Sequence, residues 1–309
     1  MAQEVSQLNV DLTCDGKCEG CEKFFDCVLP KKNSFLLTPI MDKVRERLGG
    51  IKHKIISVGG KGGVGKTLVA ANLAVALAMM GRKVTVLDQV FDAPCIPRML
   101  GVEKQGMKTS KDGLLPGEAL LGIHVVSMGL ILPEDEVLTW FHGMKRSATE
   151  ELLTTVVYGE RDYLIVDVPA GTSSDTMNAM QLIPDLSGGT IVTVPSKVSE
   201  AVAYKAAILL QKAKVPIFGI FENMATFCCD YCDEKVDLIG KGGGERLAGD
   251  VNIPFFGSIP MDRRVAECSD QGVPVVYKYP DSKASAVFMA AAKKIDETLN
   301  ATGLIGIPK

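Results

Sequence analysis

The stretch GKGGVGKT, Gly60 to Thr67, decides the fold of this 309-residue chain. It fits the phosphate-binding template Gly-x-x-x-x-Gly-Lys-(Ser/Thr), which requires a strand before it and a helix after it. HKIISV (His53–Val58) is typical of a buried strand, and TLVAANLAVALAMM (Thr67–Met80) of an apolar helix that stops at Gly81. This context favours a nucleotide loop over the alternative, a tight strand-to-helix turn with a chance lysine.

Backbone N–H groups in such a loop curl around phosphate oxygens, and the dipole at the helix N-terminus attracts negative charge. Lys66 would reach the β- and γ-phosphates, and the Thr67 hydroxyl would ligate Mg²⁺. The expected nucleotide contacts within the loop are Gly60, Lys61, Gly62, Gly63, Val64, Gly65, Lys66 and Thr67.

The loop carries one lysine more than the template needs. Lys61 follows the first glycine and should lie on the outer lip, from which it cannot easily fold back onto its own nucleotide. A cation supplied by a facing subunit assists phosphoryl transfer, as an arginine finger does. Lys61 would then make a two-fold dimer part of the active site. The alternative is a solvated lysine.

The rest of the chain repeats an alternation of short apolar strands and helices. The further expected strands are Lys83–Asp88, Asp162–Asp167, Gly189–Val194 and Pro216–Phe221, and the further expected helices are 147–158, 200–214 and Ser282–Asn300. This pattern predicts an α/β fold with a doubly wound, mostly parallel sheet. We expect a Cys-rich segment over residues 1–34 and a P-loop ATPase domain over residues 35–309.

Charge and apolar content exclude some classes of partner. The chain has 34 basic and 37 acidic residues, a net charge of -3, which does not favour nucleic acid or an anionic membrane as partner. Its first residues, MAQEVSQLNVDLTCDGKC, lack the pattern of a signal peptide, and no apolar run is long enough to span a membrane. We therefore expect a cytoplasmic protein.

Seven of the nine cysteines lie in two clusters: Cys14, Cys18, Cys21 and Cys27, then Cys228, Cys229 and Cys232. An odd count without an export signal argues against disulfides and favours metal binding. The first cluster offers four thiolates within one chain, enough for an iron–sulfur cluster or, alternatively, a zinc knuckle. Cys229 and Cys232 supply only two of the four thiolates that such a site needs. The second chain of a two-fold symmetric dimer would supply the other two. The alternatives for this pair are a redox dithiol or a shared zinc.

KGGVGKT with Lys61 resembles the deviant Walker A group, which includes the nitrogenase Fe protein, MinD, ParA and the Mrp/ApbC proteins. Further stretches are similar to the Mrp/ApbC iron–sulfur carrier ATPases in particular. They are IPRMLG (Ile96–Gly101), DYLIVDVPAGT (Asp162–Thr172), GIFENM (Gly219–Met224), the CDYC after it, and GSIPMDRRVAE (Gly257–Glu267). The last three N-terminal cysteines match the family's scaffold branch, whose first cysteine normally lies further upstream than Cys14.

The resemblance implies a role for several residues. It gives Lys61 the contact in trans and makes Asp88, with Lys61, Lys66 and Asp167, part of the catalytic set. Asp167 would hold the water shell of Mg²⁺, and Gly171 would sense the γ-phosphate through its N–H. The adenine pocket would comprise Asn223 and the backbone around Pro260 and Asp262.

The resemblance also implies a cargo and partners. A four-iron four-sulfur cluster would bridge the Cys229 and Cys232 pairs of a homodimer, for transfer to apo iron–sulfur proteins after loading from donor proteins. An Fe-protein-like reductase gated by nucleotide is an alternative. A second alternative is a MinD- or ParA-like positioning ATPase, which leaves the cysteines unexplained.

Three stretches depart from the family pattern. After the second strand, the second aspartate of Asp-x-Asp is replaced by Val90, and Asp92 follows two residues later. Ala170 and Ser174 alter the PPGTGD stretch, and Trp140–Phe141 replaces a tryptophan–arginine pair. Because the lost aspartate helps to orient water, we expect intact ATP binding and slow hydrolysis.

Overall fold

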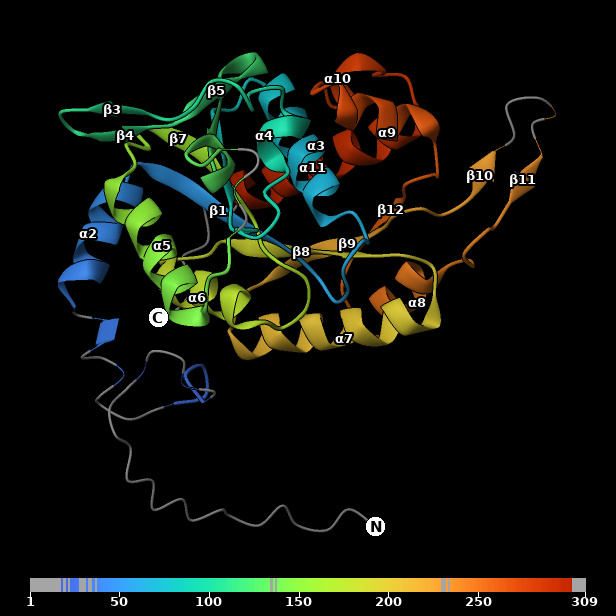
Figure 1. Ribbon diagram of the computed structural model, residues 1–309. Coiled ribbons are helices and arrows are strands. Elements are labelled where there is room, and N and C mark those ends of the chain that lie inside the picture. Colours follow the sequence, from blue (N-terminus) through green and yellow to red (C-terminus); the bar gives the residue numbers. More distant parts are fainter. Residues whose placement is uncertain are drawn as a thin grey trace, which may run out of the picture.

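The computed structural model describes residues 18, 21, 23–27, 32, 35–36, 38–133, 136, 138–228, 232 and 234–301, apart from the side chains of His142 and Cys228. An eight-stranded sheet crosses it in the order β12-β9-β8-β1-β7-β2-β6-β5, with helices on both faces (Figure 1). Its strands are β1 (Ile51–Gly59), β2 (Val84–Asp88), β5 (Gly117–Ala119), β6 (Ile123–Val126), β7 (Arg161–Asp167), β8 (Gly188–Thr193), β9 (Ile217–Glu222) and β12 (Phe255–Ser258). Every neighbouring pair is parallel except β5 with β6. The predicted doubly wound, mostly parallel fold is confirmed.

Two helical layers enclose the sheet. One face carries α3 (Lys66–Met79), α4 (Ile96–Met99), α9 (Arg263–Asp270), α10 (Val275–Lys278) and α11 (Lys283–Ala301). The other carries α2 (Pro39–Leu48), α5 (His142–Thr155), α6 (Ser174–Leu182), α7 (Lys197–Lys212) and α8 (Gly243–Asp250). Each layer buries its own hydrophobic core against the sheet.

Burial explains why the central elements are apolar on all sides. Strand β1 is covered on both faces, so Ile55, Ile56 and Val58 are all buried. Helix α3 lies between the sheet and helices α10 and α11, and its residues from Val69 to Ala78 are buried without interruption. A helix enclosed in this way needs no polar face.

The observed boundaries follow the expected ones closely for β1, β2, β7, β8, β9, α3 and α11, which all begin and end within two residues of prediction. Helix α5 begins earlier than predicted. It ends at Thr155, because the backbone at Val156 is extended and forms a β-bridge with Leu114. Helix α7 begins at Lys197, because the Ser196 hydroxyl accepts a hydrogen bond from the Ser199 N–H and caps it.

Two small ribbons extend the fold. One pairs β3 (Lys108–Ser110) with β4 (Gly113–Leu115), and the other pairs β10 (Phe227–Cys228) with β11 (Lys235–Val236). Figure 1 shows the β10–β11 ribbon projecting away from the body of the protein. Within the described part of the chain, no helix has the length and apolar character needed to cross a membrane.

Candidate functional site

The glycine loop joins the end of β1 to the start of α3, at the carboxyl edge of the parallel strands. Gly63 and Gly65 have φ values of +77° and +90°, which favour glycine. Helix α3 starts at Lys66 without a side-chain cap, so its first N–H groups lie open to a ligand. No atom of the described chain lies within 4 Å of a Cβ built on Gly62 or Gly63. The loop therefore has open space beside Gly62 and Gly63, as a phosphate cradle requires.

Two other glycines allow the loop to pack closely against neighbouring segments. A Cβ on Gly60 would lie 2.2 Å from the carbonyl carbon of Val202 in α7, and one on Gly65 would lie 2.2 Å from Asn223 Nδ2. That amide donates a hydrogen bond to the Val64 carbonyl at 3.0 Å, and the Asn223 N–H donates to the Thr193 carbonyl at 2.8 Å. Asn223 thus holds the loop backbone. Its expected contact with adenine stays a prediction.

The two loop lysines have different environments. Lys66 is 7% exposed, and its Nζ donates to the Lys61 carbonyl at 3.5 Å. Burial lowers the pKa of the Lys66 ammonium, and the charge of Asp167 partly offsets this. The Lys61 side chain is exposed on the outer lip, as expected. Its contact with a second subunit stays a prediction.

Two carboxylates from adjacent strands meet behind the loop. Asp88 and Asp167 are register partners at the ends of β2 and β7, and both are buried. Asp88 accepts hydrogen bonds from the Val90 N–H at 3.0 Å, the Ile96 N–H at 3.4 Å and the Ser127 hydroxyl at 3.0 Å. Burial raises its pKa, and the neighbouring Asp167 charge raises it further.

Asp167 lacks such support. Neither of its oxygens makes a hydrogen bond of normal geometry with the described chain. Burial raises its pKa, while the nearby Thr67 hydroxyl and Lys66 ammonium offset part of the effect. A buried, unpaired carboxylate is costly unless a cation neutralises it. Carboxylate and hydroxyl oxygens beside a phosphate loop are ligands that suit Mg²⁺.

The loop after β7 closes the other side. The Gly171 N–H donates to the Gly59 carbonyl at 2.9 Å, and Gly171 has a φ of +78°. The loop then enters α6, where the Ser173 hydroxyl caps the helix by accepting from the Thr176 N–H. Because the Gly171 N–H already has a partner, it would have to leave Gly59 to contact a γ-phosphate.

The loop after β2 contains Val90, where the sequence departs from the family pattern, and Asp92. Val90 contributes only its backbone, through the hydrogen bond to Asp88. Asp92 points elsewhere: its Oδ2 lies 2.5 Å from Lys145 Nζ. In this arrangement Asp92 does not replace the missing aspartate, because Lys145 binds its carboxylate.

Pro260 and Asp262 lie beyond β12. Pro260 lines a cavity of about 230 Å³ together with Ala225, Thr226, Lys235, Ser258 and Lys283. The Asp262 carboxylate caps α9 by accepting from the Arg264 N–H, and it pairs with the Arg264 guanidinium at 2.6 Å. Its side chain therefore has a structural task, which leaves the backbone for the expected adenine pocket.

The described N-terminal cysteines form a compact turn. The Cys21 N–H donates to the Cys18 carbonyl at 3.3 Å, and the Cys27 N–H donates to the Phe24 carbonyl at 3.4 Å. Phe24 is buried edge-on against Phe25 and Phe35. Among the described residues no group of three or more His, Cys, Asp or Glu side chains is arranged to hold a metal. Cys14 lies outside the described residues, and the N-terminal metal site stays a prediction.

The second cysteine pair belongs to the projecting ribbon. Cys232 is exposed between β10 and β11, where Phe227 pairs with Val236. Cys229 lies outside the described residues, so the pair's geometry is untested. Of the isolated cysteines, Cys268 is buried and Cys95 is exposed.

Sequence reasoning missed two side chains at this edge of the sheet. Ser127 follows β6 directly and donates to Asp88, and Lys145 in α5 binds Asp92. A signal for Ser127 existed in its position after IHVV, Ile123–Val126, a short strand at the carboxyl edge. Nothing comparable marks Lys145, because its partners come from two distant loops.

Fold and site together define a P-loop nucleotide-binding protein with a second lysine in the loop. The chain belongs to the NUBPL iron-transfer P-loop NTPase family, which it matches over residues 50–296. It is 43% identical over 285 residues to the iron-sulfur cluster carrier protein of Methanocaldococcus jannaschii, covering 92% of this chain and 97% of that protein. A carrier protein of the same description from Methanococcus maripaludis is 39% identical and covers 93% and 98%. The resemblance to the Mrp/ApbC proteins is thereby confirmed.

Solved structures agree. A nucleotide-binding protein from Archaeoglobus fulgidus, in complex with ADP, has a TM-score of 0.70 at 35% identity and covers 80% of this chain and 96% of its own. The cell division ATPase MinD of Pyrococcus furiosus has a TM-score of 0.58 at 24% identity over 80% of this chain and 99% of its own. The second likeness concerns the fold alone.

Proposed function

We propose that this protein is an ATP-dependent iron–sulfur cluster carrier or scaffold that works as a cytoplasmic homodimer. One observation carries the proposal. Asn223 holds the nucleotide loop at Val64, and the ribbon that bears Cys232 begins at Phe227, directly after it. A change in the loop is therefore passed along a few residues of backbone to the cysteine ribbon. Family membership supports the same assignment.

The nucleotide chemistry follows from the loop. Lys66 and the N–H groups of the loop bind the phosphates, and Lys61 of the facing subunit adds a positive charge. Thr67 and Asp167 hold Mg²⁺, which neutralises phosphate charge. Turnover is slow, since Val90 offers no group to orient the attacking water.

The cluster is the cargo. Two thiolates, Cys229 and Cys232, come from each chain, and two chains complete the four that a four-iron cluster takes. ATP holds the dimer closed, and hydrolysis opens it and changes the surroundings of the shared cluster. Apo iron–sulfur proteins receive the cluster, and donor proteins supply it.

A second cluster is proposed for the N-terminal segment. Cys14, Cys18, Cys21 and Cys27 would bind it within one chain, with zinc as the alternative metal.

A transfer assay tests the carrier function. The protein is reconstituted anaerobically with iron and sulfide, freed of unbound metal, and mixed with an apo-protein that takes a four-iron cluster, with and without MgATP. We expect transfer whose rate changes with ATP and disappears when Cys229 and Cys232 are both replaced by Ala. Zinc in place of iron, or transfer at the native rate by the double variant, would refute the carrier role. Redox cycling coupled to nucleotide, without transfer, would instead favour the reductase.

A further inference from the structure

Lys145 makes two ion pairs with loops that flank the nucleotide site. Its Nζ lies 2.5 Å from Asp92 Oδ2 and 3.3 Å from Asp175 Oδ2. The Lys145 side chain is 14% exposed and that of Asp175 is 11% exposed, whereas that of Asp92 is 59% exposed. Lys145 and Asp175 are thus a largely buried pair, and Asp92 is the outer partner.

The two carboxylates belong to different segments, the loop after β2 and the first turn of α6. Asp92 follows β2 and lies four residues after Asp88, while Asp175 opens α6 and lies four residues after Gly171. The loops also meet through the backbone, because the Gln89 N–H donates to the Asp167 carbonyl at 2.8 Å. Lys145 lies in α5, and its ammonium contacts both Asp92 and Asp175.

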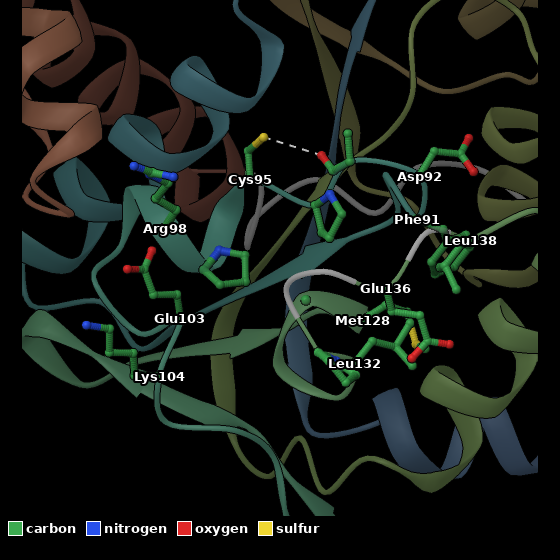
Figure 2. Close-up of a pocket in the computed structure, with 15 residues that line it drawn as sticks. Phe91, Asp92, Cys95, Arg98, Glu103, Lys104, Met128, Leu132, Glu136 and Leu138 are labelled. Atoms are coloured by element: carbon green, nitrogen blue, oxygen red, sulfur yellow. Dashed lines mark hydrogen bonds between the residues drawn. The ribbon is translucent and has the colours of Figure 1, made fainter.

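Both loops have reason and room to move. The Gly171 N–H is engaged by Gly59, so a contact between Gly171 and a γ-phosphate would displace the loop. The loop after β2 borders a cavity of about 370 Å³, lined by its own Phe91 to Cys95 and by residues including Met128 and Leu138. Figure 2 shows the Asp92 carboxylate at the end of this cavity opposite Arg98. Unfilled space beside a loop lowers the cost of shifting it.

We propose that Lys145 is a positioning residue that couples the two loops, so that displacement of the Gly171 loop by nucleotide moves the loop carrying Asp92. The inference rests on the proposed nucleotide binding. Separating Lys145 from Asp175 would leave a largely buried carboxylate with only the Ser174 hydroxyl, at 3.4 Å, as its partner, so the pair moves together. Asp92, as the outer partner, follows the lysine.

Lys145 keeps its positive charge at this position. Burial alone lowers the pKa of its ammonium, but the hydrogen bond with Asp92 and the charge of Asp175 raise it overall. Lys145 stays protonated, and both contacts persist over the pH range in which ATP is hydrolysed. Arg146, its neighbour, binds Asn178 and Gln181 of α6 and does not reach the loop after β2.

The chain contains a reporter for this motion. Trp140 is its only tryptophan, and its ring lies 6.2 Å, centroid to centroid, from that of Phe91, the residue before Asp92. Movement of the loop changes the packing of this ring pair. Intrinsic fluorescence therefore reads the position of the loop without a label.

The test compares wild type with Lys145→Gln, Asp92→Asn, Lys145→Arg and a control, Lys293→Gln, which breaks an exposed ion pair on α11. We expect MgATP to change Trp140 fluorescence in wild type, in the control and in Lys145→Arg. In Lys145→Gln and Asp92→Asn the change should disappear, and kcat should fall roughly tenfold while KM stays within about threefold. A wild-type fluorescence response in Lys145→Gln would overturn the coupling.

A measurement without nucleotide separates this inference from the proposed function. Hydrogen exchange of the free protein should accelerate in both loops, residues 89–95 and 171–176, in Lys145→Gln and in neither loop of the control. Faster exchange in one loop alone, or in none, would overturn the coupling. If wild type binds no ATP in equilibrium titration, the proposed function fails, and the exchange result still decides whether Lys145 joins the loops.

Discussion

At the scale of single residues, the site depends on a contrast between two neighbouring aspartates. Asp88 is buried with three hydrogen bonds, whereas Asp167 is buried with none of normal geometry in the described chain. Burial raises the pKa of both. The first carboxylate therefore organises the loop after β2, and the second is left for a cation.

Replacing Asp167 by Asn should stabilise the protein free of nucleotide and Mg²⁺ by about 1–2 kcal/mol, because it removes a buried carboxylate whose cost Lys66 and Thr67 only partly offset. The same change should abolish the stabilisation by MgATP. Urea denaturation with and without MgATP measures both effects. Asp88→Asn is the matched control and should destabilise, since an NH₂ donor replaces one of the two oxygens that accept hydrogen bonds from Val90, Ile96 and Ser127. An Asp167→Asn protein less stable than wild type without ligand would contradict this account.

Replacing Val90 by Asp should raise kcat for ATP by at least about tenfold, because a carboxylate regains the place from which water is oriented. KM should change little, since Val90 has no expected phosphate contact. Steady-state hydrolysis at saturating MgATP provides the measurement, with Val90→Asn as a control of equal size. Wild-type protein that already matches the Val90→Asp rate would show that another group orients the water.

Residue roles were predictable where they depend on local sequence. Gly63, Gly65 and Lys66 lie in one continuous motif, so their placement followed from the motif. The contact of Asn223 with the loop did not, because it requires the end of β9 to lie beside the glycine loop. The two partners of Lys145 escaped for the same reason: they lie on separate elements that only the fold brings together.

At the scale of elements, the fit between the glycine loop and α7 fixes where the loop lies. Gly60→Ala would place its Cβ 2.2 Å from the Val202 carbonyl carbon. We expect a loss of about 1–3 kcal/mol in the free energy of unfolding, because backbone has to shift. Thermal denaturation and ATP titration would show lower stability together with weaker binding.

Gly62→Ala is the matched control for this fit. No described atom lies within 4 Å of its Cβ, and its φ is not positive. Its stability should stay within about 0.5 kcal/mol of wild type. Equal destabilisation by the two variants would mean that α7 does not set the position of the loop.

The predictable elements are those with long, uniform patterns. Helix α3 and the central strands are apolar throughout because they are buried on all sides, and the sequence shows it. The β10–β11 ribbon escaped because each of its strands has two residues, too few for an alternation to be seen. Helix α6 was not predicted, because its nine residues mix polar and apolar side chains that are nearly all buried.

At the scale of the whole molecule, Lys61 should act between subunits. Lys61→Ala should weaken ATP-induced dimerisation and hydrolysis while ATP still binds, because Lys66 remains. Lys66→Ala should lose binding in its own subunit. Equilibrium dialysis and sedimentation measure the two properties.

Mixing the two variants tests whether Lys61 acts in trans. A heterodimer of Lys61→Ala and Lys66→Ala chains keeps one site in which Lys66 comes from one chain and Lys61 from the other. Hydrolysis should rise on mixing above the rate of either variant alone. Loss of ATP binding in Lys61→Ala itself would rule out the role in trans.

The last prediction concerns how many clusters the assembled dimer holds. Cys229 and Cys232 need a partner chain, whereas the N-terminal four cysteines serve one chain, so a loaded dimer holds one shared and two separate clusters. With four irons in each, this is about 6 irons per chain. Replacing Cys229 and Cys232 by Ala should leave about 4, and replacing Cys18, Cys21 and Cys27 should leave about 2. Iron and sulfide analysis after anaerobic reconstitution measures these values.

The shared cluster should also leave first. Its ribbon projects from the body of the protein and Cys232 is exposed, so the fold shields the cluster little (Figure 1). The N-terminal turn, in contrast, packs a buried Phe24 against the partly buried Phe25 and Phe35. Apo-acceptor should therefore drain about 2 irons per chain from wild type and none from the Cys229/Cys232 variant. Iron lost first from the N-terminal cysteines would mean that the ribbon is not the point of delivery.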